Sequence, residues 1–259
     1  MDTPICDFVK RYAENQFFRL HMPGHKGKAL LGPEPLDITE VEGADVLYHA
    51  DGIIRRSEEN AAELFGTART LYSAEGSSLC IRAMLYLTVL YAKANGKKPV
   101  IAAGRNAHQT FMTAAALLDV EIRWLYPENR DGLISCDINA AYLERFFASC
   151  RELPAAVYVT TPDYLGNLLD MASLSAVCHR YGVLLLVDNA HGAYLRFLPQ
   201  PLHPAGLGAD LCCDSAHKTL PVLTGGAYLH ISRSAPSFFL PPAEKAMALF
   251  ASTSPSYLI

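Results

Sequence analysis

The sequence lacks any uninterrupted apolar run that approaches the roughly 20 residues needed to cross a bilayer. It also lacks a basic tract, and its 22 Lys and Arg residues are interspersed among 26 Asp and Glu residues. The N-terminus has no basic segment followed by an apolar stretch, so no secretory signal is expected. These absences argue against membrane and nucleic-acid partners and predict a cytoplasmic protein that acts on a small molecule.

The seven cysteines form no C-x-x-C pair, and their number is odd. Most of them lie within apolar stretches, which is typical of reduced, buried thiols. A disulfide framework and a structural metal site are therefore not expected.

Short apolar stretches alternate with helical segments through most of the chain. Strands are predicted at Thr70–Ala74, Val100–Ala103, Glu121–Leu125, Ala155–Thr160, Val183–Val187, Leu211–Cys213 and Gly226–Ile231. Helices of 10 or more residues between short strands indicate crossover connections. The sequence therefore predicts an α/β fold of three layers, in which a mainly parallel seven-stranded sheet carries helices on both faces.

The beginning of the chain differs from the rest. After one helix it is rich in Gly, Pro and Asp and shows no helical period, which indicates an irregular loop. We therefore predict an N-terminal segment over residues 1–52 and a larger α/β domain over residues 53–259. Within that domain a helix is expected over Ser57–Phe65, and Asp137 is expected to cap a later helix.

Ligands of open α/β sheets bind beyond the carboxyl ends of the strands, where four polar motifs fall. The first contains Gly76, Ser77 and Ser78 and matches neither the P-loop nor the dinucleotide fingerprint. Its backbone N–H groups and hydroxyls suit a phosphate, although such a turn is also an ordinary helix cap. The second motif is His108, which could cap a helix or stack on a flat heteroaromatic ring.

The third motif follows the apolar strand Val183–Val187, which places Asp188 at a carboxyl end. A carboxylate there needs a cationic or hydrogen-bonded partner, and the protonated nitrogen of a pyridine ring would serve. Ala190 is small enough to leave room for the face of the ring. Two alternatives remain open: Asp188 caps the next turn, or Asp188 and His191 bind a metal, for which ligands are too few.

The fourth motif carries Lys218 after an apolar strand, with Ser215 and His217 nearby. Partial burial would lower the pKa of this lysine and make its amine available for imine formation. The alternative is a surface lysine on a turn. In combination, a phosphate turn, a stacking ring, a carboxylate for a pyridinium and an imine-forming lysine are what pyridoxal phosphate requires.

Several stretches also resemble one known family. The sequence is similar over nearly its whole length to the major domain of the Orn/Lys/Arg decarboxylases, which are fold-type I pyridoxal-phosphate enzymes. The similarity is carried by His21–Gly27, Asp45–Gly66, Val187–Gly192, Ser215–Pro221 and Thr224–Ala227.

This resemblance implies a role for each site residue. Lys218 would be the Schiff-base lysine, Asp188 the partner of the pyridine nitrogen, and His108 the ring that stacks on the cofactor. Ala190 would lie against the other face of the ring, His191 would also bind the cofactor, and Gly76, Ser77, Ser78, Ser215 and His217 would hold the phosphate. The implied reaction converts lysine, arginine or ornithine to an amine and CO₂, as in polyamine biosynthesis, within a homodimer or larger assembly.

The resemblance also sets the alternatives. Family members continue into a C-terminal domain, so we expect this chain to be a truncated cofactor-binding platform. The fold-type I scaffold also hosts aminotransferases and other lyases. A third possibility is an incomplete, inactive decarboxylase fragment.

Overall fold

The computed structural model describes residues 1–15, 17–127 and 134–259. One sheet, in the order β1-β7-β6-β5-β4-β2-β3, runs through the molecule. Its strands are β1 (Arg69–Ser73), β2 (Val100–Gly104), β3 (Glu121–Leu125), β4 (Ala156–Thr160), β5 (Leu184–Asp188), β6 (Leu211–Asp214) and β7 (Ala227–Ile231). Only β7 runs antiparallel to its neighbours, β1 and β6. The predicted mainly parallel seven-stranded sheet is confirmed.

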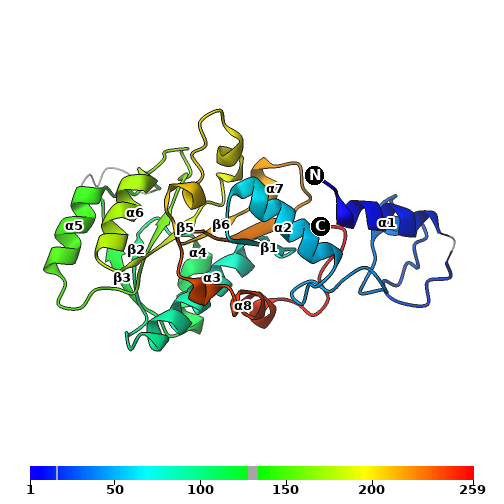
Figure 1. Ribbon diagram of the computed structural model, residues 1–259, viewed down its shortest axis with the longest axis horizontal. Coiled ribbons are helices and arrows are strands. Elements are labelled where there is room, and N and C mark those ends of the chain that lie inside the picture. The colour runs from blue at the N-terminus through cyan, green and yellow to red at the C-terminus, as the bar shows by residue number, and fades with distance from the viewer. Residues whose placement is uncertain (16, 128–133) are drawn as a thin grey trace.

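Helices cover both faces of this sheet, as predicted. The helices are α1 (Pro4–Glu14), α2 (Ile53–Phe65), α3 (Gly76–Ala94), α4 (Gln109–Leu117), α5 (Ala140–Ser149), α6 (Met171–Arg180), α7 (Ala216–Thr219) and α8 (Ala243–Phe250), with 3₁₀ turns η1 (Glu34–Leu36), η2 (Ala193–Phe197), η3 (Pro204–Leu207) and η4 (Ser237–Phe239). Helices α3, α4 and α8 lie on one face, and α2, α5 and α6 lie on the other (Figure 1). No helix in the described ranges is long and apolar enough to span a membrane.

The central strand β5 shows why the apolar stretches are continuous. Leu184 and Leu186 pack into the core beneath α3 and α4, whereas Leu185 and Val187 pack into the core beneath α5 and α6. A strand covered on both faces buries every side chain, so its sequence does not alternate. The same alternation of faces continues to Asp188, whose carboxylate reaches Tyr158 of the first core.

Helix α2 begins at Ile53, four residues before the predicted start at Ser57. The side chain of Asp45 caps it from a distance, because its Oδ2 accepts the backbone N–H groups of Gly52 at 2.8 Å and Ile54 at 2.9 Å. Local sequence gives no sign of a cap that lies seven residues upstream of the N-cap position. The predicted end of the helix at Phe65 is confirmed.

Helix α5 also has a different cap from the one expected. Asn139, not Asp137, occupies the N-cap position, and its Oδ1 accepts the N–H of Tyr142 at 2.9 Å. Both residue types are good caps, and the two-residue difference reflects where the chain leaves its extended approach. The error is confined to the helix boundary.

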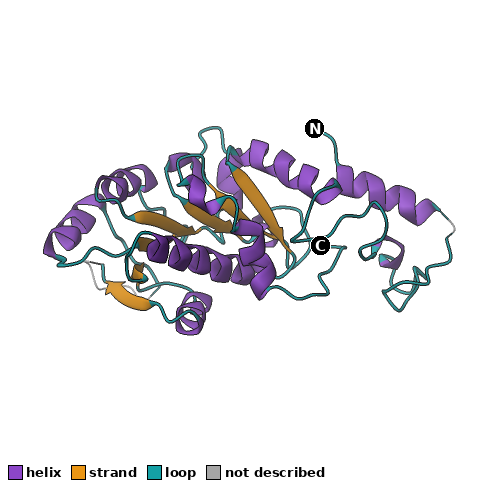
Figure 2. Cartoon of the chain, turned by 60° about the horizontal axis from the view of Figure 1, so that its bottom comes forward, coloured by secondary structure: helices purple, strands orange, loops and turns teal. Residues whose placement is uncertain are grey.

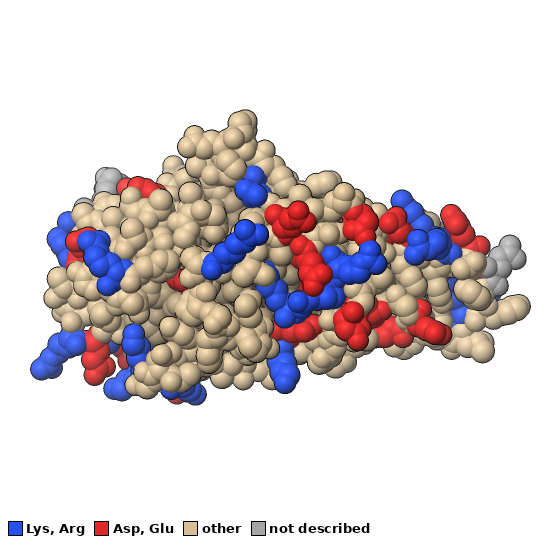
Figure 3. All heavy atoms as spheres, in the orientation of Figure 1, with Lys and Arg blue, Asp and Glu red and all other residues tan. Residues whose placement is uncertain are grey.

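The N-terminal segment forms a small apolar cluster of its own around Val9, Ile38 and Ala44, joined by Tyr257 from the far end of the chain. It lies at one end of an elongated molecule (Figure 2). Acidic and basic side chains intermingle on the face drawn in Figure 3, as the composition indicates. The division of the chain at residue 52 stays a prediction.

Candidate active site

A cavity of about 210 Å³ opens at the carboxyl edge of the sheet. Ten residues that the sequence singled out line it together: Gly76, Ser77, Ser78, His108, Asp188, Ala190, His191, Ser215, His217 and Lys218. They come from the ends of β5 and β6 and from the starts of α3, α4 and α7. Residues far apart in the chain meet here because the parallel strands all end at the same edge.

The Gly76 turn forms one wall of the cavity. Gly76 has a φ of +67°, which favours glycine, and its N–H donates to the carbonyl of Gly225 at 2.7 Å. Glu75, at the N-cap position of α3, makes no side-chain capping bond, so it does not occupy the N–H groups of Ser77 and Ser78. The hydroxyl of Ser215 donates to Oγ of Ser77 at 2.7 Å. Uncapped N–H groups and clustered hydroxyls at the start of a long helix form a suitable phosphate cradle.

His217 lies beside this turn. A Cβ placed on Gly76 would be 3.9 Å from Cε1 of the His217 ring. The ring Nδ1 is 2.9 Å from the carbonyl of Gly226, which can only accept, so Nδ1 carries a hydrogen. This bond fixes the ring so that its Nε2 is the nitrogen left for a ligand.

Asp188 is fully buried at the end of β5. Its Oδ2 accepts the hydroxyl of Tyr158 at 3.0 Å, and its Oδ1 accepts the N–H of Ala190 at 3.2 Å. Burial raises the pKa of Asp188 above its ordinary value, even though the Tyr158 bond acts in the opposite direction. The Asp188 carboxylate therefore caps the following turn, as one of the alternatives predicted. Because the carboxylate is buried, a cation placed against it would be strongly stabilised by its negative charge.

Lys218 is exposed, which corrects the expectation of partial burial: α7 is a single short turn at the rim of the cavity. Its Nζ lies 3.1 Å from Nε2 of His191. Burial, and next the charge of Lys218, lower the pKa of His191, so the imidazole is neutral and accepts a hydrogen bond from the amine. Among the described residues, Asp188 and His191 belong to no group of three or more potential metal ligands.

His108 occupies the N-cap position of α4. Its Nδ1 accepts the N–H of Thr110 at 3.2 Å, so the capping interpretation of this residue is confirmed. Capping also fixes the ring at the wall of the cavity, with Nε2 as the nitrogen that carries hydrogen in the neutral form. Stacking of the ring on a cofactor stays a prediction.

Three further residues of the cavity were not predicted: Asn106, Thr160 and Tyr164. Thr160 ends β4, so the rule that ligands bind at carboxyl ends could have identified it. Its Oγ1 is buried and has no hydrogen-bond partner among the described residues, which marks a group that a ligand can satisfy. The ring of Tyr164 lies 5.2 Å from that of His191 between centroids.

The mainly parallel seven-stranded sheet, with a polar cavity at its carboxyl edge, is the arrangement expected for the large domain of a fold-type I pyridoxal-phosphate enzyme. The lysine decarboxylase A of Pseudomonas aeruginosa has this fold, with a TM-score of 0.82 and 19% identity over 98% of this chain and 38% of that one. The lysine decarboxylase LdcF of Francisella novicida gives a TM-score of 0.79 and 21% identity over 99% and 39% of the two chains.

The sequence comparisons identify the family. The model of the Orn/Lys/Arg decarboxylase major domain matches residues 3–259. An arginine decarboxylase of Bacillus subtilis is 31% identical over 272 aligned residues, which cover all of this chain and 53% of the relative. The chain therefore belongs to the Orn/Lys/Arg decarboxylase family, and it spans about half the length of the curated relatives it matches.

Proposed function

We propose that this chain is the cofactor-binding part of a pyridoxal-phosphate-dependent decarboxylase that converts a basic amino acid to an amine and CO₂. The observation that carries the proposal is the shared cavity, in which an accessible lysine amine, a buried carboxylate and an uncapped helix N-terminus meet. The substrate would be lysine, arginine or ornithine, as the family and the names of its relatives suggest.

The residues of the cavity fit pyridoxal phosphate. The N–H groups and hydroxyls of the Gly76 turn, with Ser215, suit the phosphate, and the Thr160 hydroxyl offers an unused hydrogen bond. Asp188 suits the pyridine nitrogen, because a buried carboxylate with a raised pKa is stabilised by a cation. When bound, the cofactor would supply an electron sink for the pair left on Cα when CO₂ departs.

The protein groups would each have a defined task. Asp188 would hold a proton on the ring nitrogen, and Tyr158 and the Ala190 N–H would hold Asp188 in place. The neutral His191 would accept a hydrogen bond from the Lys218 amine at 3.1 Å and so hold that amine at the cavity. His108, at the wall of the cavity, would limit the tilt of the cofactor ring.

The first test is the near-visible absorption spectrum of the purified chain mixed with pyridoxal phosphate. We expect a band of lysine-bound cofactor that borohydride fixes, and its complete loss in Lys218→Ala, because no other described amine lines the cavity. Lys98→Ala is the matched control, since Lys98 is exposed at the amino end of β2, and it should keep the full band. A band that persists in Lys218→Ala would overturn the assignment of the lysine.

The second test separates decarboxylation from its rivals. Release of CO₂ and of the matching amine from lysine, arginine or ornithine is expected from the cofactor-loaded protein. A keto-acid product would instead favour an aminotransferase. If the cofactor is bound and none of the three substrates releases CO₂, the same assay on a chain extended past Ile259 distinguishes an inactive fragment from a wrong reaction.

A homodimer or larger assembly is expected from the family, and the mass of the cofactor-loaded protein in solution would measure it.

A further inference from the structure

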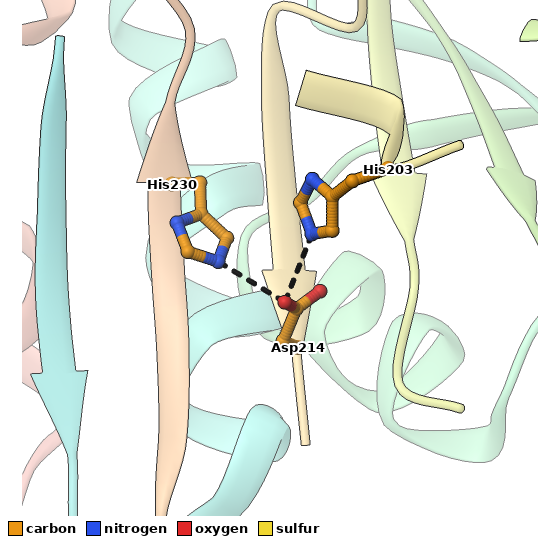
Figure 4. A group of neighbouring side chains, drawn as sticks. All are labelled: His203, Asp214 and His230. Atoms are coloured by element: carbon orange, nitrogen blue, oxygen red, sulfur yellow. Dashed lines mark hydrogen bonds and ion pairs between the residues drawn. The ribbon is translucent and has the colours of Figure 1, made fainter. Parts of the chain in front are cut away.

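Three fully buried side chains meet directly behind the cavity, on the face of the sheet opposite Asp188. His203, Asp214 and His230 converge so that both imidazoles contact one carboxylate oxygen (Figure 4). Oδ2 of Asp214 lies 2.9 Å from Nε2 of His203 and 3.2 Å from Nε2 of His230. Nothing in the mechanism proposed above uses these residues.

The hydrogen-bond pattern identifies the cluster as a set of donors around one charge and not as a metal site. Nδ1 of His203 receives the backbone N–H of Ala205 at 3.3 Å, so the hydrogen of that neutral ring is on Nε2 and points at Asp214. A nitrogen that carries hydrogen has no lone pair for a metal. Nδ1 of His230 lies 2.9 Å from the hydroxyl of Thr70, which can donate to it and leave Nε2–H for Asp214.

The charges agree with this assignment. Burial would raise the pKa of Asp214, but the attraction and hydrogen bonds of His203 and His230 outweigh it and hold the pKa below its ordinary value. Burial lowers the pKa of His230, which keeps that ring neutral near pH 7. Asp214 is therefore a buried carboxyl group that ionises more readily than an ordinary one, and hydrogen bonds from two imidazoles fix its orientation.

The other oxygen of Asp214 connects the cluster to the active site. Oδ1 accepts Nδ2 of Asn189 at 2.6 Å, and the backbone N–H of Asn189 donates to the carbonyl of Cys213 at 2.9 Å. Asn189 directly follows Asp188 and precedes Ala190, so its side chain holds the segment that carries the pyridine-binding carboxylate. Asp214 itself ends β6 and begins the segment that leads to Lys218.

We propose that Asp214 is a positioning residue of the cofactor site: clamped by His203 and His230, it holds Asn189 and so fixes the spacing between the Asp188 and Lys218 segments. The inference rests on the proposed function. Small misplacements of reacting groups cost large factors in rate and affinity, so a rigid tie between two catalytic segments has a measurable value.

A charge swap tests the tie. Asn189→Asp alone sets two carboxylates against each other across a 2.6 Å contact, and we expect pyridoxal-phosphate affinity to fall by at least about tenfold. In the double variant Asp214→Asn with Asn189→Asp, an amide again faces a carboxylate. The amide oxygen introduced at position 214 can still accept hydrogen bonds from both imidazoles. The double variant should recover affinity to within about fivefold of the original protein.

Asp210→Asn is the matched control. Asp210 is also a buried carboxylate of the β6 segment, bound to Nε2 of His179 at 3.0 Å and to the N–H of Leu185 at 2.7 Å, but it lies at the amino end of the strand. The Asp210→Asn substitution should lower thermal stability and leave the cofactor spectrum and the pyridoxal-phosphate affinity unchanged. If Asp210→Asn reduces affinity as much as Asn189→Asp does, the effect is general destabilisation and the proposal is wrong.

Cofactor-free protein provides a readout that does not depend on the proposed function. Nitrogen NMR of the histidine rings should show Nε2–H forms of His203 and His230, and the amide signals of His191 and Lys218 should shift in Asn189→Asp and return in the double variant. If the native chain forms no lysine-bound cofactor but these shifts occur, the proposed function fails and the tie stands. A folded double variant without recovery, or stoichiometric metal bound to the cluster, would overturn the tie.

Discussion

Asp188 and Asp214 end neighbouring parallel strands, are both fully buried, and yet differ in their electrostatics. Asp188 accepts two conventional donors, Tyr158 and the Ala190 N–H, and burial raises its pKa. Asp214 accepts three donors, and its pKa is lowered. Each also lies near a cysteine thiol, at 3.7 and 3.9 Å respectively, so that contact does not explain the difference.

The comparison teaches that the electrostatic attraction and hydrogen bonds of its neighbours, more than depth, decide the state of a buried carboxylate in this fold. Glu58 extends the series. It lies on α2 against β1, its Oε1 accepts one N–H from Tyr72 at 3.0 Å, and its Oε2 has no hydrogen-bond partner in the described parts of the chain. Burial raises the pKa of Glu58 to about 7. A carboxylate with few donors is thus prepared to receive a proton or a cation, whereas Asp214 is already satisfied.

The largest effect is expected from Asp188→Asn. An amide cannot offer a charge to a pyridinium, and loss of a charge-assisted hydrogen bond of about 1.5–3 kcal/mol corresponds to a loss in cofactor affinity of about 100-fold at the upper end. Titration of the cofactor-free protein with pyridoxal phosphate, followed by absorbance, measures the change. Unchanged affinity would mean that Asp188 does not face the ring nitrogen.

The same variant has a second, opposite effect on stability. Because the folded-state pKa of Asp188 is raised, its contribution to folding is greatest below the unfolded value of about 3.9 and is lost as the pH rises. Cofactor-free Asp188→Asn should therefore be more stable than the original protein at pH 7, and the gain should shrink as the pH falls toward about 4. Urea unfolding at both pH values checks the sign.

These carboxylates also show what the sequence could and could not predict. Asp188 was predicted because it follows an apolar strand, and the sheet with its cavity follows from the same alternation of apolar and helical segments. Asp214 also ends an apolar strand, but its two imidazoles come from η3 and β7. The antiparallel pairing that sets Cys212 opposite His230 brings one of them to Asp214, and no local spacing encodes that pairing.

Other omissions have the same cause. Tyr158 sits within an apolar strand and resembles a core residue until the register of β4 against β5 brings its hydroxyl to Asp188. The start of α2 was misplaced because its cap, Asp45, lies outside the helix. Sequence pattern thus predicts which residues reach the carboxyl edge, whereas side-chain partners depend on long-range packing.

A stability effect of intermediate size is expected from Glu58→Gln. The raised pKa means that the stabilisation from this group is full below about 4.3 and is lost as the pH rises through about 7, because the buried carboxylate must then ionise. Above that pH the glutamine variant should gain about 2 kcal/mol over the original protein, and at pH 5 it should gain little.

Glu59→Gln is the control for this variant. Glu59 is the next residue on α2, is exposed and pairs with Arg55 at 2.8 Å, so its change should stay within about 0.5 kcal/mol at either pH. Thermal unfolding across pH 5 to 8 reports both variants. Equal pH profiles for Glu58→Gln and the original protein would show that donor number does not govern the Glu58 carboxyl.

The smallest effect, and the sharpest test of donor number, is expected from Tyr158→Phe. The change removes only the hydroxyl that donates to Asp188 and keeps the ring, which packs on Phe111 with centroids 4.3 Å apart. Loss of one neutral hydrogen bond, worth about 1 kcal/mol, should weaken pyridoxal-phosphate binding about fivefold, since Asp188 holds its charge less readily.

Tyr72→Phe is the control for this variant. The Tyr72 hydroxyl donates to the Ser57 carbonyl at 2.8 Å, away from the cavity, so its removal should alter stability alone. If Tyr158→Phe binds the cofactor as tightly as the control, then Asp188 is held ionised by the bound ring and not by its protein donors, and the number of donors does not explain its contrast with Asp214.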